Sequence, residues 1–272
     1  MKFSISNIGW PESLDEDVIS IVRSLGYEGL EIAPTRCFMD GYDVARDELI
    51  KFKDRNLRQG LNLCSMQSLL FGITTPIFSS EENKNSVLSK MDKVFNFAQQ
   101  LEIPNLVFGS PSIRNVNNED ELNRSIEFFK ACAHQAHLKK CTLSIEPNPT
   151  IYKTNFLTTT ADALDYIKNL EVKGIGLNFD LGTVIHNQES IENLLTLETI
   201  AYVHHVHISE PLLAPIQDSH RELHKELLLK LKTLKYTNYV SIEMKSIDDI
   251  KEIERILRYI KDVAIEVGVW NG

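Results

Sequence analysis

Short apolar segments recur along the chain, and longer amphipathic segments separate them. In the short segments apolar residues alternate with small or polar ones, which is typical of β-strands because successive side chains point to opposite faces. In the intervening segments apolar residues recur every three or four positions, as in helices with one buried side. The predicted strands span residues 2–8, 29–34, 61–68, 105–110, 142–147, 174–180, 201–209 and 239–244.

Strand–helix repeats of this kind predict one closed barrel. Alternating strands and helices with short connections favour a parallel sheet with right-handed crossovers, and eight such units close on themselves. The 272 residues fit one such domain, and no Pro-, Gly- or Ser-rich linker divides them. We therefore expect an α/β fold, a single (β/α)8 TIM barrel over residues 1–272.

Helix starts carry capping residues. Ser13 with Glu16 and Ser219 with Glu222 fit the spacing of capping boxes, and Asn118 precedes an acidic first turn. We expect these residues to accept hydrogen bonds from the first backbone N–H groups of three helices.

Composition is that of a globular protein with a full core, with 43% hydrophobic and 25% charged residues. The net charge of −9 and the lack of a basic run argue against nucleic acid as a partner. No apolar run approaches the ~20 residues that span a bilayer, and no signal peptide is visible. The four cysteines show no pairing pattern. We expect reduced thiols, a cytoplasmic location and no membrane contact.

Four predicted strands end near a side chain that can bind a metal: Glu146, Asp180, His207 and Glu243. Each lies on the non-aliphatic face of its strand, and barrel active sites form at the carboxyl ends of strands. Carboxylates packed this closely would repel one another unless a cation neutralised them. Each residue taken alone could instead be a polar residue of the barrel interior or a helix cap. Together they predict a site for one divalent ion such as Mg²⁺, Mn²⁺ or Zn²⁺.

The segments SIEPNP, NFDLGTVIH, HHVHISE and VSIEMK carry these residues at separations of 34, 27 and 36. In them the chain resembles the xylose-isomerase-like barrels, a superfamily of sugar isomerases and epimerases that also holds endonuclease IV-type nucleases. The resemblance implies that Glu146, Asp180, His207 and Glu243 hold one Mn²⁺, Mg²⁺ or Co²⁺ ion. It also implies that Glu146 and Glu243 act as a catalytic acid/base pair, passing a proton through an enediolate.

Three positions depart from the ketose epimerases of that superfamily. Thr183 stands where a His is expected, Tyr152 where a Glu is expected, and Leu213 where an Arg is expected. The departures leave open a different sugar, a modified or nucleotide-linked sugar, or loss of catalysis. The nuclease branch requires further His and Asp ligands, and only Asp218 and His220 follow His207 closely.

Other polar residues are candidates near the site. Glu31 points into the predicted barrel, as a substrate contact, a partner of the metal ligands, or a structural acid. Gln67 ends its strand where a sugar hydroxyl could be held. His205 lies one layer below His207 and could orient the metal ligands, although a core histidine is the common case.

Four more candidates come from loops. His186 could replace the missing family histidine, and Trp10 could form an apolar wall for a sugar ring or pack in the core. Arg114 or Lys245 could hold a phosphate or carboxylate, or be solvated. The segment 208–220 is long and apolar, and we expect a lid or a contact within a homo-oligomer.

The function predicted is isomerisation or epimerisation of a sugar or sugar derivative by proton transfer, with a divalent ion (Mn²⁺, Mg²⁺, Co²⁺ or Zn²⁺) as cofactor. One alternative is a dehydratase of a keto-sugar or polyol that starts from the same enediolate. The other is a barrel that binds a sugar or a partner protein without turnover.

Overall fold

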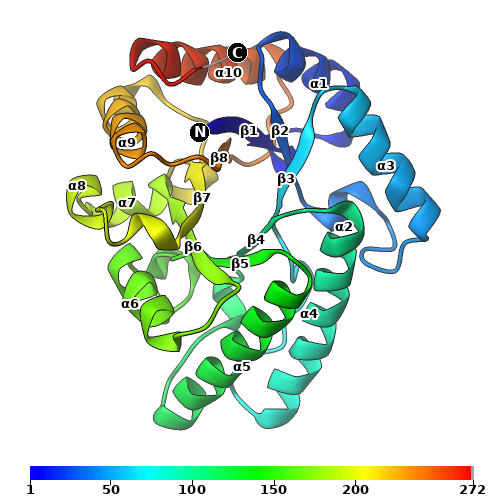
Figure 1. The fold of residues 1–272 in the computed structure, drawn as a ribbon, viewed down its shortest axis with the longest axis vertical. Coiled ribbons are helices and arrows are strands. Elements are labelled where there is room, and N and C mark those ends of the chain that lie inside the picture. Colours follow the sequence, from blue (N-terminus) through cyan, green and yellow to red (C-terminus); the bar gives the residue numbers. More distant parts are fainter. Residues whose placement is uncertain (271–272) are drawn as a thin grey trace.

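The computed structural model describes residues 1–270 and forms a closed parallel barrel (Figure 1). Each strand pairs with the next along the chain, and β1 pairs with β8 to close the barrel. The predicted fold and all eight predicted strands are confirmed, although most strands are a few residues shorter than expected. They are β1 Lys2–Ser6, β2 Gly29–Ile32, β3 Asn62–Met66, β4 Asn105–Phe108, β5 Thr142–Ile145, β6 Ile175–Asp180, β7 Val203–Ile208 and β8 Tyr239–Ile242.

Helices surround the barrel on its outside (Figure 1). The α-helices are α1 Asp15–Ser24, α2 Pro34–Cys37, α3 Arg46–Arg58, α4 Glu81–Leu101, α5 Glu119–Leu138, α6 Thr160–Leu170, α7 Leu181–Asn187, α8 Ile191–Leu194, α9 Arg221–Thr233 and α10 Ile250–Glu266. Short 3₁₀ turns are η1 Asn7–Gly9, η2 Glu12–Leu14, η3 Pro111–Ile113, η4 Thr150–Tyr152, η5 Ile200–Tyr202, η6 Pro211–Leu213 and η7 Asp218–His220.

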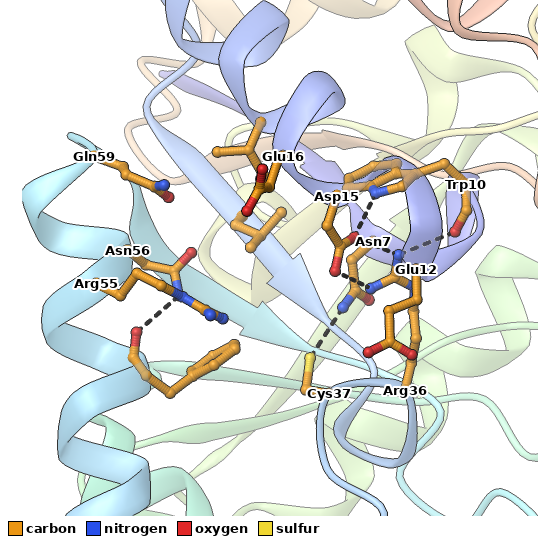
Figure 2. Close-up of a pocket in the computed structure, with 13 residues that line it drawn as sticks. Asn7, Trp10, Glu12, Asp15, Glu16, Arg36, Cys37, Arg55, Asn56 and Gln59 are labelled. Carbon is orange, nitrogen blue, oxygen red and sulfur yellow. Dashed lines mark hydrogen bonds and ion pairs between the residues drawn. The ribbon is translucent and has the colours of Figure 1, made fainter.

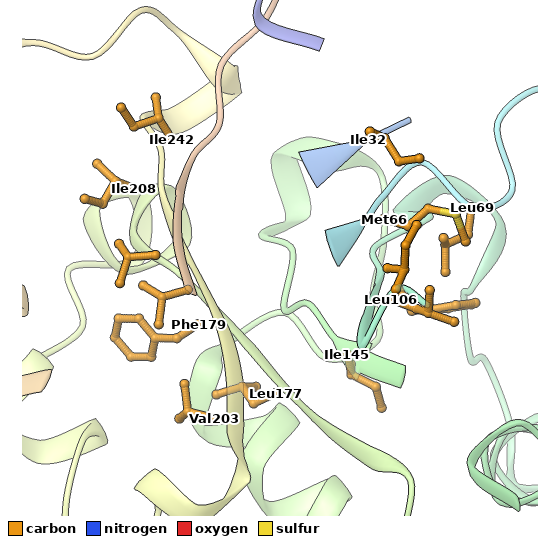
Figure 3. Packing of buried hydrophobic residues seen from close by; sticks show 14 of the residues in the cluster. Ile32, Met66, Leu69, Leu106, Ile145, Leu177, Phe179, Val203, Ile208 and Ile242 are labelled. Carbon is orange, nitrogen blue, oxygen red and sulfur yellow. The ribbon is translucent and has the colours of Figure 1, made fainter. Parts of the chain in front are cut away.

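The apolar core lies between the strands and the helices. Ile32, Leu177 and Ile242 are buried members of this core, and Figure 3 shows them on different parts of the barrel wall. The alternate strand positions point into the barrel and are largely polar, as with Ser4 and Asn178, both fully buried. Buried polar groups need partners, and several inside the barrel hydrogen-bond one another, as Ser144 does with Asn105 and Gln67 with Glu31. This polar interior leads up to the candidate site.

One of the three predicted helix caps is confirmed. The Asn118 side chain accepts a hydrogen bond from the backbone N–H of Glu121, at the start of α5. The predictions of capping boxes at Ser13 and Ser219 are wrong. Each serine lies in a 3₁₀ turn, η2 or η7, and the helix that follows begins without a side-chain cap. The extra turn moves the helix start beyond the reach of the serine.

Across residues 1–270, the helices are all too short or too polar to cross a membrane. The four cysteines are free thiols, as the absence of a pairing pattern predicts.

Candidate metal centre at the barrel mouth

Four strands bring the four candidate ligands to the carboxyl end of the barrel. Glu146 follows β5, Asp180 ends β6, His207 lies in β7 and Glu243 follows β8. One ligand atom from each of the four lies within 4.8 Å of all the others. The alternation of each strand places these side chains on the inward face, so they converge at one height.

The His207 ring lies at the centre of this group. Its Nδ1 atom is 3.2 Å from Glu146 Oε1, 3.1 Å from Glu243 Oε2 and 3.0 Å from Asn178 Nδ2. Burial lowers the pKa of His207, but the carboxylates of Glu243 and Glu31 outweigh burial and hold it well above the usual value. The ring therefore meets negative charge at both nitrogens, from Glu31 beside Nε2 and from Glu243 beside Nδ1.

Neighbouring polar groups hold the carboxylates in place. Glu146 accepts hydrogen bonds from Asn178 Nδ2 at 2.8 Å and Asn148 Nδ2 at 3.0 Å. Asp180 accepts one from the backbone N–H of Thr183 at 2.6 Å and another from the hydroxyl of Ser209. Asp180 is thus also the N-cap of α7. The same side chain is both a helix cap and a candidate metal ligand.

The carboxylates repel one another because they are buried together. Burial and then the charge of Glu146 raise the pKa of Asp180 to about 6. Burial raises the pKa of Glu243 to about 7, with Glu146 and Asp180 adding to it and His207 opposing it. Burial also raises the pKa of Glu146, but His207 outweighs it and leaves this pKa below its usual value.

Within residues 1–270, no Lys or Arg side chain forms an ion pair with these three carboxylates, and His207 is the ion-pair partner of Glu146 and Glu243. Three oxygen ligands and one imidazole nitrogen are the donors that Mg²⁺, Mn²⁺ or Zn²⁺ accept in proteins. The residues present therefore fit a divalent ion, which would neutralise the carboxylates.

A cavity of about 240 Å³ opens above this group. Glu146, Asp180 and Glu243 form its floor, and apolar side chains, among them Leu69 and Leu213, form part of its wall. Among the described residues, no Lys, Arg or His lines this cavity. The residues that line it are Gln67, Ser68, Leu69, Val107, Gly109, Ser110, Pro111, Glu146, Asn148, Tyr152, Asp180, Leu213 and Glu243.

Two of the three positions that depart from the ketose epimerases line this cavity. Tyr152 and Leu213 both contribute to the wall, and the Tyr152 hydroxyl accepts a hydrogen bond from the backbone N–H of Leu212 at 2.8 Å. This hydrogen bond connects the segment 208–220 to the loop that follows β5. Thr183 is buried and donates its hydroxyl hydrogen to Pro147 O at 2.9 Å, so it faces the protein.

Three of the other candidate site residues lie under or beside the four candidate ligands. Gln67 lines the cavity and donates a hydrogen bond to Glu31. Glu31 does not line the cavity but lies under His207, with Oε1 3.1 Å from His207 Nε2. His205 Nε2 is 2.7 Å from Glu31 Oε2. A direct substrate contact for Glu31 does not agree with this position.

The remaining candidates lie elsewhere. Trp10 lines a separate cavity of about 400 Å³ near α1 and α3, where it donates a hydrogen bond to Asp15 and lies 5.5 Å from the Arg36 guanidinium (Figure 2). His186 on α7 and Lys245 after β8 are exposed and line no part of the cavity at the barrel mouth. We leave these three residues out of the proposed site.

Arg114 is fully buried and serves the backbone. It donates to Glu146 O at 2.8 Å and Gly109 O at 2.9 Å. Burial lowers its pKa to about 10. A guanidinium that is committed to carbonyl oxygens cannot receive a phosphate, so Arg114 positions the loop that carries Glu146.

Sequence reasoning gave no role to the groups that hold the ligands, namely Asn148, Asn178 and Ser209. The sequence signal that could have identified them is their position, because each lies two residues along the chain from a candidate ligand. Asn178 shares the inward face of its strand with Asp180.

Asp218 and His220, the residues after His207 that could have supplied further nuclease ligands, do not join the candidate metal centre. Asp218 pairs with Arg255 at 3.0 Å, and His220 pairs with Glu210 at 2.8 Å. Neither belongs to a cluster that could hold a metal.

Solved structures share this fold along nearly the whole chain. D-psicose 3-epimerase from Clostridium cellulolyticum H10, solved with D-tagatose, superposes with a TM-score of 0.80 at 15% identity, covering 98% of this chain and 99% of that one. 3-Keto-D-glucoside 4-epimerase from E. coli gives 0.76 at 16% identity, covering 96% and 99%. AP endonuclease, family 2, from Brucella melitensis gives 0.76 at 15% identity, with the same coverage.

At these identities the likeness concerns the fold. No curated protein sequence matches the chain significantly. The sequence model of one family does match, over residues 19–263. The chain therefore belongs to the xylose isomerase-like TIM barrel family.

Proposed function

We propose that this protein is a divalent-metal-dependent epimerase or isomerase of a sugar. The observation that carries the proposal is the convergence of Glu146, Asp180, His207 and Glu243 within 4.8 Å at the barrel mouth, where the three carboxylates line a cavity. The neighbouring structures named for D-psicose 3-epimerase and 3-keto-D-glucoside 4-epimerase support a sugar as substrate.

Glu146 and Glu243 are the proposed acid/base pair. They project from β5 and β8, on well-separated parts of the barrel wall, and both line the cavity. A sugar between them would present one face to each carboxylate. One glutamate removes the proton α to the carbonyl, and the other returns a proton to the opposite face. A bound divalent ion would stabilise the negative charge that develops on the substrate oxygens.

The cavity lining favours an uncharged sugar over a phosphorylated or nucleotide-linked one. Three carboxylates line the cavity, and no basic side chain does. A phosphate would be repelled and would find no charge-assisted hydrogen bond. Leu69, Tyr152 and Leu213 supply an apolar wall for the end of the substrate that does not react.

The first experiment is elemental analysis of wild-type protein beside Asp180→Ala and His207→Ala. We expect about one Mn, Mg, Co or Zn per chain in the wild type and a large loss in both variants. Wild-type protein that binds no divalent ion after reconstitution would rule out this mechanism and leave a non-catalytic barrel as the better reading.

The second experiment incubates the metal-loaded protein with neutral ketoses and keto-glycosides in deuterated water. Deuterium at the carbon next to the carbonyl, lost in Glu146→Gln and Glu243→Gln, is the expected result. Release of water from the substrate would instead indicate the dehydratase. Turnover of a sugar phosphate in preference to its neutral counterpart would contradict the substrate class.

A further inference from the structure

A second buried polar cluster lies under the candidate metal centre, inside the barrel. Glu31 of β2, Gln67 after β3 and His205 of β7 make up the cluster, and it ends on His207. The Glu31 side chain is 0% exposed. In residues 1–270 its ion-pair partners are the two histidines alone.

The His207 ring is held between two sets of carboxylates. On one side Nε2 lies 3.1 Å and 3.2 Å from the two carboxylate oxygens of Glu31. On the other side Nδ1 faces Glu146 and Glu243, at the floor of the cavity. The two ring nitrogens therefore face different groups: Nε2 faces the Glu31 carboxylate, and Nδ1 faces the carboxylates of Glu146 and Glu243.

The chemistry of imidazole assigns a role to each nitrogen. A neutral imidazole has one N–H and one lone pair, and a metal binds through the lone pair. An ionised carboxylate only accepts hydrogen bonds, so Glu31 keeps the hydrogen on Nε2. Glu146 and Glu243 also face Nδ1, but they belong to the set that would share a divalent ion with His207, so a bound ion would take the lone pair on Nδ1 and leave the hydrogen on Nε2, facing Glu31. Asn178 Nδ2, which can only donate, is 3.0 Å from Nδ1 and agrees with this assignment.

The Glu31 carboxylate is itself fixed on both oxygens. Gln67 Nε2 donates to Oε1 at 2.9 Å and lies 2.6 Å from Ser6 Oγ. His205 Nε2 is 2.7 Å from Oε2. With both oxygens engaged, the carboxylate has one orientation, and that orientation faces Nε2 of His207.

We propose that Glu31 is a positioning residue that fixes the tautomer and orientation of His207, so that Nδ1 is free to hold the divalent ion. Gln67 and His205 hold Glu31 in turn. The inference rests on the metal centre proposed above. Carboxylate partners of metal-bound histidines act in this way in general, and their removal typically weakens metal affinity 10–100-fold.

The test is a calorimetric titration of metal-free protein with Mn²⁺. Glu31→Gln, which keeps the size of the side chain, should still bind one Mn²⁺ but 10–100-fold more weakly than wild type. Glu121→Gln is the matched control, because Glu121 is also a buried acid but lies on α5, where it accepts a hydrogen bond from the backbone N–H of Asn117. Its Mn²⁺ affinity should equal that of wild type.

Nuclear magnetic resonance of ¹⁵N-histidine-labelled wild-type protein loaded with Zn²⁺ tests the tautomer without relying on a variant. His207 is assigned by the loss of its signals in His207→Gln. The hydrogen should reside on Nε2. A hydrogen on Nδ1 would overturn the proposal, whether or not Glu31→Gln folds.

The two proposals fail in different ways. If wild-type protein binds no Mn²⁺, the metal centre and the role of Glu31 both fall. If wild type binds Mn²⁺ and folded Glu31→Gln binds it equally tightly, the metal centre stands and the positioning role of Glu31 is wrong.

Discussion

Gly109 leaves the space that the Glu146 carboxylate occupies. A Cβ atom at this position would lie 2.8 Å from Glu146 Oε2 and 3.5 Å from Asn148 Oδ1. The carboxylate would have to move, and it is held by two asparagine amides that fix its direction.

We therefore expect Gly109→Ala to weaken Mn²⁺ binding about tenfold while changing the free energy of unfolding by less than about 1 kcal/mol. Calorimetry and urea unfolding measure the two effects. Gly9→Ala is the control, since its Cβ would make an ordinary 3.4 Å contact with Met244. Equal Mn²⁺ affinity in both variants would show that the exact placement of Glu146 does not matter.

His224 makes stability depend on pH. It is fully buried on α9, with Nδ1 2.9 Å from the Tyr259 hydroxyl of α10. Burial, followed by the charges of His220 and Arg221, lowers its pKa to about 4, against about 6.5 in an unfolded chain. Between these values the unfolded chain binds more protons, so the stability from this residue is complete above pH 6.5 and falls as the pH drops toward 4.

The expected loss attributable to His224 is about 2 kcal/mol between pH 8 and pH 5. Urea unfolding at both pH values should show a smaller loss in His224→Gln than in wild type. His134→Gln, an exposed change on α5, should behave as wild type. If His224→Gln loses as much unfolding free energy between pH 8 and pH 5 as wild type does, other groups cause the pH dependence.

Single residues differ in how far the sequence predicts them. The four candidate ligands could be picked out because each ends an alternating apolar run. Asn148 and Ser209 could not, since a polar residue beside a strand end has many roles. The position of Trp10 after a strand predicts a place near the site, but its indole N–H donates a hydrogen bond to Asp15.

At the scale of elements, helix caps show where local signals work. Asn118 caps α5 through the backbone N–H of Glu121 at 2.9 Å, whereas Ser13 makes no such bond at the start of α1. The spacing of Ser13 and Glu16 resembles a capping box, but the η2 turn intervenes.

We expect Asn118→Ala to lower the free energy of unfolding by about 1 kcal/mol, because a helix N–H loses its acceptor. Ser13→Ala should change it by less than about 0.5 kcal/mol. Denaturant unfolding of both variants beside wild type measures the difference. A larger effect at Ser13 than at Asn118 would contradict the assignment of these helix starts.

Strand prediction succeeded where cap prediction failed because the two signals differ in length. A strand is indicated by several alternating residues, so one exception does not remove the pattern. A capping box depends on two residues, and one inserted turn defeats it.

At the scale of the whole molecule, the four candidate ligands come together only in the folded chain. They are spread from Glu146 to Glu243, and strand pairing brings them within 4.8 Å. A metal that binds this set binds the folded state and stabilises it by mass action.

Mn²⁺ at 100 times its dissociation constant should add about 2.7 kcal/mol to the free energy of unfolding. For a chain of this size that raises the thermal midpoint by roughly 5 °C. Scanning calorimetry with Mn²⁺, and again after a chelator is added, measures the shift. Asp180→Ala should show none, and an equal shift in that variant would place the bound ion elsewhere.

The barrel could be predicted as a whole because its strand–helix unit repeats eight times, so errors at single boundaries do not change the fold. Glu31 and His205 could be named as candidate partners of the metal ligands, but the contacts of the network under the site could not be predicted. Glu31 and His207 lie on strands far apart in the chain, and their contact follows from register around the closed barrel.

The pairing of β1 with β8 has a consequence for how the protein is made. Lys2 pairs with Tyr239, so β1 cannot complete its pairing until β8 has been synthesised. At ~5–20 residues per second, that delay is on the order of tens of seconds. During this time one edge of β1 is open to other chains. Since β8 precedes Glu243 and completes the barrel, the nascent chain cannot bring the four candidate ligands together before it has been synthesised through Glu243.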